Sequence, residues 1–351
     1  MRYYSCEHGR MTEYFAKLTS AKDRVAKELQ RRGVEPRYLQ FGGPGDVLAR
    51  IFVPTDARSE FLANRAMGDW AEHLLAEAVT RTASGYRVVH YGNSDRMAAG
   101  EEGFKAFYTA TLDDVRVFGK RPDLLIVPDT YTGPDDVSGQ GTEALRPLVA
   151  SALAAVEVRS SKFEALLYAK VRAEERKVGK VTGRESQSFT VKVEDLKIVY
   201  RWIENFKKPQ AYCQVFFDSM YAINVLRIFE IIGSGAGFQI DNPAKSQEKT
   251  TIMIPITSGQ RVATYDEIPT FTVEHQVTRL GRHDAYHIAE MALRGLRRHT
   301  AWLANTYCAR VGADEMLGIG HVRHDRVVRG ARSAASIQHG VGQRPRPHGH
   351  G

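Results

Sequence analysis

The spacing of apolar residues predicts two amphipathic helices in the first part of the chain. Residues 14–33 carry apolar side chains about three and four positions apart and end in a glycine, which is typical of a helix and its stop. Residues 59–82 repeat this spacing more strongly. The apolar face of this second helix would carry Leu62, Ala66, Trp70, Leu74 and Ala78. A strand is predicted next, over residues 86–92.

Two short apolar runs in the middle of the chain have the composition of strands that are buried on both faces. They lie at residues 123–127 and 154–161. Helices are predicted to begin near Lys162 and to cover 193–206, and a long strand is predicted over 211–223. This order of elements predicts an α/β fold in which helices flank a mixed central β-sheet.

The last third of the chain follows a different pattern. Residues 233–282 are rich in glycine, threonine and proline and contain the strand candidates TIMIPIT and TFTVEHQV. Residues 286–307 have the periodicity of a helix. We therefore expect an added C-terminal region that contains β-strands and a helix. Residues 321–351 lose this periodicity and are expected to form a disordered tail.

The composition is that of an ordinary soluble globular protein. The 351 residues are 43% hydrophobic and 26% charged, which allows a sizeable core. No apolar run approaches the length of about 18 residues that a membrane helix needs, and the first residues lack the apolar core of a signal peptide. We expect a cytoplasmic protein. The three cysteines are far apart and odd in number, and so are expected to be free thiols.

The net charge of +8 favours a polyanionic partner, because basic side chains that neutralise phosphates release counterions. The charge is unevenly distributed. Residues 321–351 hold six arginines and one aspartate, and so contribute +5 of the total. The charge alone is therefore weak evidence for nucleic-acid binding by the folded part of the chain.

Each of the two buried runs carries a carboxylate. Asp123, preceded by proline, opens the first run, and Glu157 lies inside the second. Burying an ionised carboxylate costs several kcal/mol unless a cation compensates. Carboxylate oxygens and water are the ligands that Mg²⁺ prefers, and such a site can activate a water next to a phosphodiester. The alternative is that Asp123 caps a strand end and Glu157 pairs with Arg159 at a solvent-facing edge.

These segments resemble the PD-(D/E)xK nuclease superfamily, which includes most type II restriction endonucleases. The resemblance covers about residues 60–230 and is carried by RPDLLIV, AAVEVRSSKFEA and KPQAYCQVFFDSMYAI. It implies a restriction-endonuclease-like fold in which Asp123 and Glu157 bind Mg²⁺. It also implies a catalytic glutamate on the preceding helix, for which Glu72 is the best match.

The chain departs from this superfamily at the third element of the motif. Two residues after Glu157 stands Arg159, where the family pattern has lysine. Arginine keeps its proton, so it can stabilise negative charge but cannot act as a general base. Either Arg159 or Lys162 would then be the catalytic cation. Strand alternation sets Lys162 on the opposite face, so it would reach the metal only if the strand ended or bulged near Ser160.

Further residues are candidates for binding. The basic run after the second carboxylate would contact DNA phosphates through Lys170, Arg172, Arg176 and Lys177, or would form a solvated helix face. Asp218 is either a further functional carboxylate or a residue that caps or ends its strand.

Two other patterns suggest ligands only weakly. His283 and His287 have a zinc-compatible spacing, but no third ligand is evident. The glycine-rich stretches 41–46 and 233–237 lack the features of nucleotide-binding loops, so no nucleotide cofactor is expected.

The resemblance and the pattern divide the chain into four parts. These are residues 1–58 as an N-terminal helical extension, 59–232 as the nuclease core, 233–320 as a recognition and dimerisation region, and 321–351 as the basic tail. The resulting hypothesis is a type II restriction endonuclease of a restriction-modification system. It would act as a homodimer on double-stranded DNA and leave 5′-phosphate ends. The alternatives are a non-cleaving DNA-binding protein, a repair or junction nuclease, and a DNA methyltransferase, whose motifs are absent.

Overall fold

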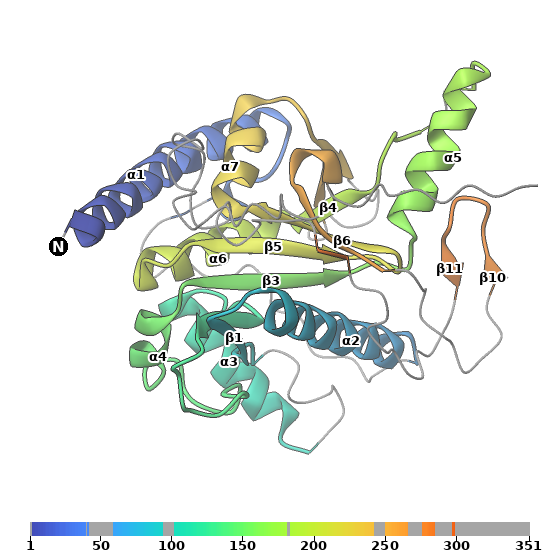
Figure 1. Cartoon of the computed structure of the whole chain (residues 1–351). Helices are drawn as coiled ribbons and strands as arrows, with labels where there is room; N and C mark the ends of the chain where they lie inside the picture. The colour runs from blue at the N-terminus through green and yellow to red at the C-terminus, as the bar shows by residue number, and fades with distance from the viewer. Residues whose placement is uncertain are drawn as a thin grey trace, which may run out of the picture. The chain divides into compact units, whose positions relative to one another are not determined.

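A computed structural model describes residues 2–39, 41, 59–93, 102–180, 183–241, 250–265, 276–284 and 297–298. Contacts divide the chain into residues 1–310 and 311–351, and every element described below belongs to the first unit. The predicted α/β fold, with a mixed sheet flanked by helices, is confirmed (Figure 1).

Within the described residues, the central sheet has seven strands in the order β1-β2-β3-β5-β6-β9-β12. Its strands are β1 (Tyr86–His90), β2 (Leu124–Pro128), β3 (Ala154–Ser160), β5 (Gln210–Val215), β6 (Ser219–Asn224), β9 (Gln260–Thr264) and β12 (Arg297–Arg298). Only the pair β3 and β5 is parallel, and the other neighbours are antiparallel. Leu124 of β2 pairs with Val156 of β3, so the two buried runs singled out in the sequence are adjacent strands.

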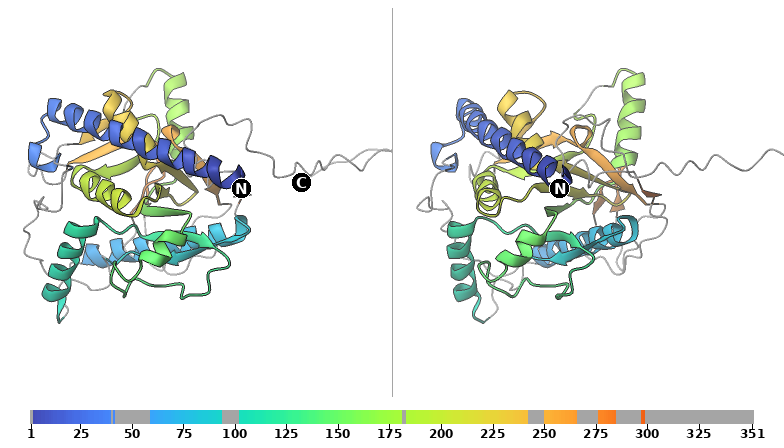
Figure 2. Two further views of the ribbon diagram at one scale, coloured as in Figure 1. Left: turned by 90° about the vertical axis from the view of Figure 1, so that its left-hand side faces the viewer. Right: turned by 60° about the vertical axis from the view of Figure 1, so that its left-hand side comes forward.

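Helices cover both faces of this sheet (Figure 2). The described helices are α1 (Arg2–Arg31), α2 (Ser59–Thr82), α3 (Phe104–Phe118), α4 (Arg146–Ser151), α5 (Ala165–Lys177), α6 (Val193–Phe206) and α7 (Val225–Ser234). Side chains of α1, α6 and α7 pack into one hydrophobic cluster with one face of the sheet, and α2 packs against the other face. The described part of the predicted apolar face of α2 is buried, at Trp70, Leu74 and Ala78.

The alternation of side chains along β2 and β3 decides which face each residue meets. Val156 and Val158 belong to the cluster beneath α2, and Ala155 belongs to the opposite cluster. Glu157 lies between the two valines, and since successive strand residues point to opposite faces, its side chain points toward α6. The acidic side chain of β3 therefore lies in the layer between the sheet and α6.

Several predicted elements agree closely with the structure. The helices predicted over 59–82 and 193–206 are α2 and α6, and the one predicted over 14–33 lies within α1 apart from its last two residues. The helix expected from Lys162 starts at Ala165 as α5. The strand candidate TIMIPIT contains β8 (Thr251–Pro255), which joins β4 (Ser188–Lys192) and β7 (Gln239–Asp241) in a separate three-stranded sheet.

Other predictions are wrong. The long strand over 211–223 is two antiparallel strands, β5 and β6, because the chain turns at Phe216, Phe217 and Asp218. The segments that form α3 and α7 were not predicted as helices. A continuous helix over 286–307 is contradicted at residues 297–298, which form β12 next to β9, and its other residues lie outside the described ones.

The described residues test only part of the expectations about membrane helices and free cysteines. None of the described helices combines the length and the apolarity that crossing a bilayer requires. Cys213 is a buried free thiol, as expected. The other two cysteines, the glycines at 42–46, most of the strand candidate TFTVEHQV and the basic tail lie outside the residues whose side chains are described.

Candidate active site

Asp123 lies directly before β2, at the end of the segment Gly119-Lys120-Arg121-Pro122. Its side chain reaches the next strand, where Oδ2 accepts a hydrogen bond from the Val158 amide at 2.6 Å. Its carbonyl oxygen accepts hydrogen bonds from the amides of Tyr91 at 2.9 Å and Gly92 at 3.0 Å. Gly92 approaches so closely that a Cβ there would lie 3.0 Å from Asp123 Cα. Asp123 is thus fixed between β1 and β3.

Glu157 is the most deeply buried charged residue of the site, with a relative exposure of 0%. Its Oε1 forms ion pairs with Lys120 Nζ and, at 2.8 Å, with the Arg159 guanidinium. The alternative in which Glu157 pairs with Arg159 at a solvent-facing edge is therefore half right: the pair exists, but on an inner strand of the sheet.

The two carboxylates influence each other strongly. Burial, and then the negative charge of Glu157, raise the pKa of Asp123 well above its ordinary value, while Lys120 and Arg159 oppose the rise. Two acidic groups on adjacent strands therefore share a site with less than full compensation of their charge.

Arg159 bridges the sheet and α6. Its guanidinium lies 2.8 Å from Glu157 Oε1 and 3.1 Å from Asp195 Oδ2, and Asp195 is a buried residue in the first turn of α6. Burial lowers the pKa of Arg159, but the carboxylates of Glu157 and Asp195 outweigh burial and raise it. Arg159 therefore stays positively charged, as expected for an arginine.

Lys120 is a site residue that the sequence reasoning missed. It stands three positions before Asp123, in FGKRPD, and its side chain reaches Glu157. Burial is the largest effect and lowers its pKa, but the charges of Glu157, Asp195 and Asp123 together outweigh burial and the pKa is raised. A signal was present in the sequence, since a lysine next to the proline-aspartate that opens a buried strand must lie near that strand's first residues.

Three buried polar atoms around the carboxylates have no hydrogen-bond partner among the residues that the structure describes. They are Glu157 Oε2, the Tyr212 hydroxyl and Gln214 Oε1. Tyr212 pairs with Glu157 across the parallel strands β3 and β5, and burial followed by the charge of Glu157 raises its pKa well above the ordinary value. Buried polar atoms without partners are rare in folded proteins and often mark a site for an ion, a water or a ligand.

Glu72, the candidate from the preceding helix, lies on α2 near this site. Its Oε2 is 3.5 Å from His90 Nδ1, and its charge contributes to the raised pKa of Asp123. The hydrogen bond that His90 donates to Glu72 is the main cause of the raised pKa of His90, and burial opposes this rise. His90 pairs with Leu124 and was not singled out in the sequence.

Lys162 follows the end of β3. That strand does end at Ser160, as the Lys162 alternative required, and the Ser161 amide donates to Val215 O at 2.9 Å. The charged groups with the largest effects on the pKa of Asp123 are Glu157, Lys120, Glu72 and Arg159, and Lys162 is not one of these four.

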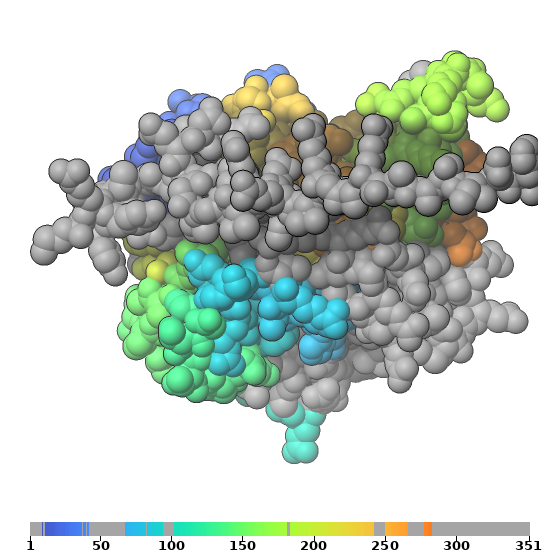
Figure 3. All heavy atoms as spheres, in the orientation of Figure 1, coloured from blue at the N-terminus to red at the C-terminus, as the bar shows by residue number. Residues whose placement is uncertain are grey.

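The basic residues after β3 lie on α5, which stands out from the surface (Figures 1 and 3). Arg172 pairs with Glu175 at 2.8 Å, Arg176 with Glu185 at 2.5 Å, and Lys177 with Glu174 at 2.7 Å, while Lys170 is exposed. Acidic side chains thus offset much of the positive charge of this helix.

Asp218 holds the start of α5. Its two carboxylate oxygens accept hydrogen bonds from the amides of Ala165 and Leu166 at 2.8 Å and Leu167 at 3.3 Å. Asp218 lies in the turn after β5, and its carboxylate caps α5, a helix distant in sequence, rather than its own strand.

Two further patterns play no part in this site. Gly235, in the stretch 233–237, ends α7 with a φ of 74°, so it is a helix stop. His283 lies in the two-residue strand β11 (His283–Asp284), which pairs with β10 (Gln276–Val277), and His287 lies outside the described residues.

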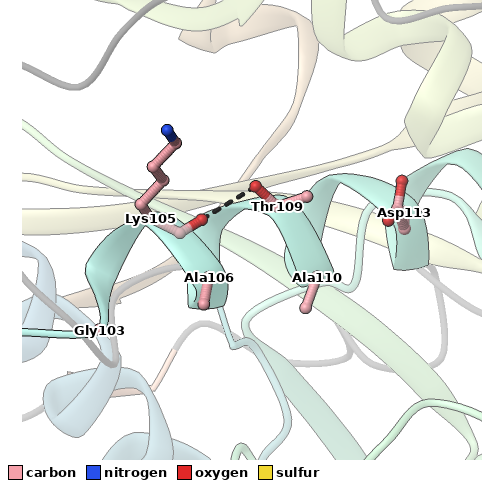
Figure 4. Close-up of a pocket in the computed structure, with 6 residues that line it drawn as sticks. All are labelled: Gly103, Lys105, Ala106, Thr109, Ala110 and Asp113. Carbon is pink, nitrogen blue, oxygen red and sulfur yellow. Dashed lines mark hydrogen bonds between the residues drawn. The ribbon is translucent and has the colours of Figure 1, made fainter.

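A hollow of about 730 Å³ lies along α3 and is lined by Gly103, Lys105, Ala106, Thr109, Ala110 and Asp113 (Figure 4). The Thr109 hydroxyl donates to the Lys105 carbonyl of the same helix. The hollow has no residue in common with the carboxylate site.

The fit of a metal ion can be judged from the donor set. Among the described residues, no group of three or more His, Cys, Asp or Glu side chains is arranged to hold a metal. Mg²⁺, however, usually binds through one or two carboxylates together with waters and substrate phosphates. The unbonded Glu157 Oε2 and the raised pKa of Asp123 fit such a site.

A family model described as AccI restriction endonuclease matches residues 23–181 and 165–288, which together span well over half of the chain. No curated protein and no solved structure matches.

Proposed function

Since the chain belongs to the AccI restriction endonuclease family, whose members are site-specific deoxyribonucleases, we propose that it cleaves double-stranded DNA in a Mg²⁺-dependent reaction centred on Asp123 and Glu157. The single observation that carries this proposal is the geometry of Glu157. It is fully buried beside a second, half-buried carboxylate, and its Oε2 has no hydrogen-bond partner among the described residues. This also supports the PD-(D/E)xK assignment of the chain.

Asp123 and Glu157 would hold the metal ion. When bound, Mg²⁺ supplies a Lewis acid for the phosphate and lowers the pKa of a coordinated water, so no lysine base is required. The hydrogen bond from Val158 to Asp123 keeps the first carboxylate oriented, and the ion pairs of Oε1 leave the other oxygen of Glu157 for the ion.

Arg159 is the candidate for orienting Glu157 and for adding positive charge beside the scissile phosphate. Asp195 fixes its guanidinium at 3.1 Å, so Arg159 is held before substrate binds. Preorganised donors of this kind lower the barrier because they need no rearrangement when negative charge develops. Glu72 and its partner His90 lie on the other side of Asp123, and we propose that Glu72 supports the site through that pair.

DNA would extend from this site toward α5. Although its neighbours are paired with acidic residues, Lys170 is exposed, and Arg172, Arg176 and Lys177 can exchange carboxylate partners for phosphates. We propose a homodimer acting on a palindromic site in the cytoplasm, with 5′-phosphate products, as part of a restriction-modification system. Residues 233–320 would supply recognition and dimer contacts.

One observation favours a second function. Lys120 and Arg159 both bind Glu157 Oε1, so two cations already compete with a metal for this carboxylate. If Lys120 and Arg159 kept the metal ion from binding Glu157, the protein would bind its DNA site without cutting it.

Incubation of the purified protein with plasmid and phage DNA, with and without Mg²⁺, separates the two functions. The proposed function predicts discrete fragments that require Mg²⁺. The absence of cutting at any Mg²⁺ concentration, together with site-specific retention of labelled duplexes, would support the non-cleaving alternative, and smearing would indicate a nuclease without sequence specificity.

A further inference from the structure

We propose that Lys120 is the catalytic cation that contacts the scissile phosphate, in place of the lysine that the nuclease motif has two residues after its acidic residue. This inference rests on the proposed function and deepens it. Arg159, which occupies the motif position, then becomes a positioning residue for Glu157.

The first argument is location. Lys120 reaches Glu157 Oε1 from the segment that leads into Asp123, so its ammonium group is adjacent to one proposed metal ligand and only three positions from the other along the chain. Its side chain is 18% exposed and that of Arg159 is 27% exposed, whereas that of Glu157 is 0% exposed, so both cations lie on the outer side of the carboxylate. A substrate phosphate would approach from that side.

The second argument is that the backbone fixes Lys120 on both sides. Its own amide donates to Ile198 O of α6 at 3.0 Å. Gly119 before it lies directly against α6, where an added Cβ would overlap Trp202 N and Ile198 O. Arg121 after it is buried and donates to Gln140 O at 2.8 Å. A lysine delivered by a rigid segment is preorganised for one position.

The third argument is the balance of charge. The Arg159 guanidinium is shared between Glu157 and Asp195, so two carboxylates already offset its charge. Lys120 forms its described ion pair with Glu157, and the charges of Asp195 and Asp123 act on it more weakly. An ammonium has three N–H donors, so Lys120 can hold Glu157 and bind a phosphate oxygen at the same time.

The test compares Lys120→Met and Lys120→Gln with Lys120→Arg, and uses Lys208→Met as a matched control. Lys208 is also half-buried, but it donates to the carbonyls of Ala150 and Ala152 at 2.6 and 2.8 Å and touches no carboxylate of the site. Lys120→Gln keeps a donor for Glu157 and removes only the charge. Circular dichroism checks that each variant folds.

Two quantities are measured for each variant: the single-turnover cleavage rate at saturating Mg²⁺, and the affinity for Mn²⁺ without DNA by electron paramagnetic resonance. Loss of Lys120 should lower the rate about 100- to 1,000-fold, as for removal of one oxyanion donor. Mn²⁺ affinity should stay equal or rise, because a positive charge beside Glu157 is gone. Lys120→Arg should recover part of the rate, and Lys208→Met should match the wild type.

The outcomes separate this inference from the proposed function. A wild-type rate in Lys120→Gln, or a larger loss in Lys162→Met than in Lys120→Met, would overturn the role of Lys120 and leave the endonuclease intact. A parallel loss of rate and of Mn²⁺ affinity would show that Lys120 only supports the structure, which also overturns the inference. A wild-type protein that never cleaves would remove the proposed function and this inference with it.

Discussion

Gly119 links the fold to the active site, and replacing it with alanine should damage both. The residue ends α3 with φ 89° and ψ 176°, a backbone conformation that is essentially restricted to glycine. It also lies against α6, where a Cβ would overlap Trp202 N and Ile198 O and would lie 2.8 Å from Trp202 Cα. Trp202 is fully buried, so this part of α6 is closely packed and its backbone cannot easily shift away from an added Cβ.

The expected loss of stability has two parts. The unfavourable backbone conformation costs about 1–3 kcal/mol for a residue with a Cβ. Overlap with backbone atoms in a packed layer adds about 1–3 kcal/mol, the usual penalty for overpacking. Gly119→Ala should therefore lower the free energy of unfolding by about 2–6 kcal/mol, a large fraction of the 5–15 kcal/mol typical of a domain.

Gly85→Ala is the matched control. Gly85 has a φ of 86°, close to that of Gly119, but a Cβ added there meets no atom within 4 Å. Gly85→Ala should therefore lose only the stability that the unfavourable backbone conformation costs. Urea unfolding followed by tryptophan fluorescence gives the loss in free energy of unfolding for both variants. DNA cleavage by Gly119→Ala under stabilising conditions shows whether Lys120 still reaches its position in the proposed site. Equal losses for the two variants would refute the close approach of Gly119 to α6.

Three further predictions address other parts of the site. Asp218→Ala removes the acceptor for three amides at the start of α5 and should cost about 0.5–2 kcal/mol in urea unfolding, with Asp218→Asn intermediate; equal stability of all three proteins would rule out the cap. Asp123 binds its proton more tightly in the folded than in the unfolded chain, so its carboxylate lowers stability as the pH rises above the ordinary aspartate range. Asp123→Asn should therefore raise the Tm of EDTA-treated protein at neutral pH by a few degrees, about 2–4 °C per kcal/mol, and a fall would contradict the buried charge. Glu72 raises the pKa of His90, so their pair stabilises the fold below the ordinary histidine pKa and this contribution is lost as the pH rises through the raised value. Glu72→Gln should lower the His90 pKa in an NMR titration, and an unchanged value would exclude the pair.

The fold was largely predictable where a single local pattern determines an element. The helix α2 and the strands β2 and β3 form where the sequence predicts them, because burial on one or both faces requires their apolar patterns. The β5–β6 turn was missed because Phe216 and Phe217 are apolar and buried, so the run has no polar break before Asp218. A turn inside the core lacks the usual signal of glycine, proline and exposed polar residues.

The site was predictable to the extent that motif and strand coincide. Asp123 and Glu157 were found because a carboxylate in an apolar strand conflicts with its surroundings. Lys120 and Asp195 were not, since their approach to Glu157 and Arg159 depends on how α6 packs over the sheet. The position of Lys120 three residues before Asp123 indicates nearness to that strand but not contact with Glu157, and Asp195 lies far from Arg159 in sequence.

The central claim is that Asp123 and Glu157 are needed for cleavage and dispensable for recognition. Its most direct test is single-turnover cleavage of a duplex with the mapped site by wild type, Asp123→Asn, Glu157→Gln and the control Glu143→Gln, an exposed carboxylate paired with Arg146. Binding to the same duplex is measured in Ca²⁺. The account predicts that the two site variants bind specifically without cutting while the control does both. Robust cleavage by Asp123→Asn or Glu157→Gln would contradict it.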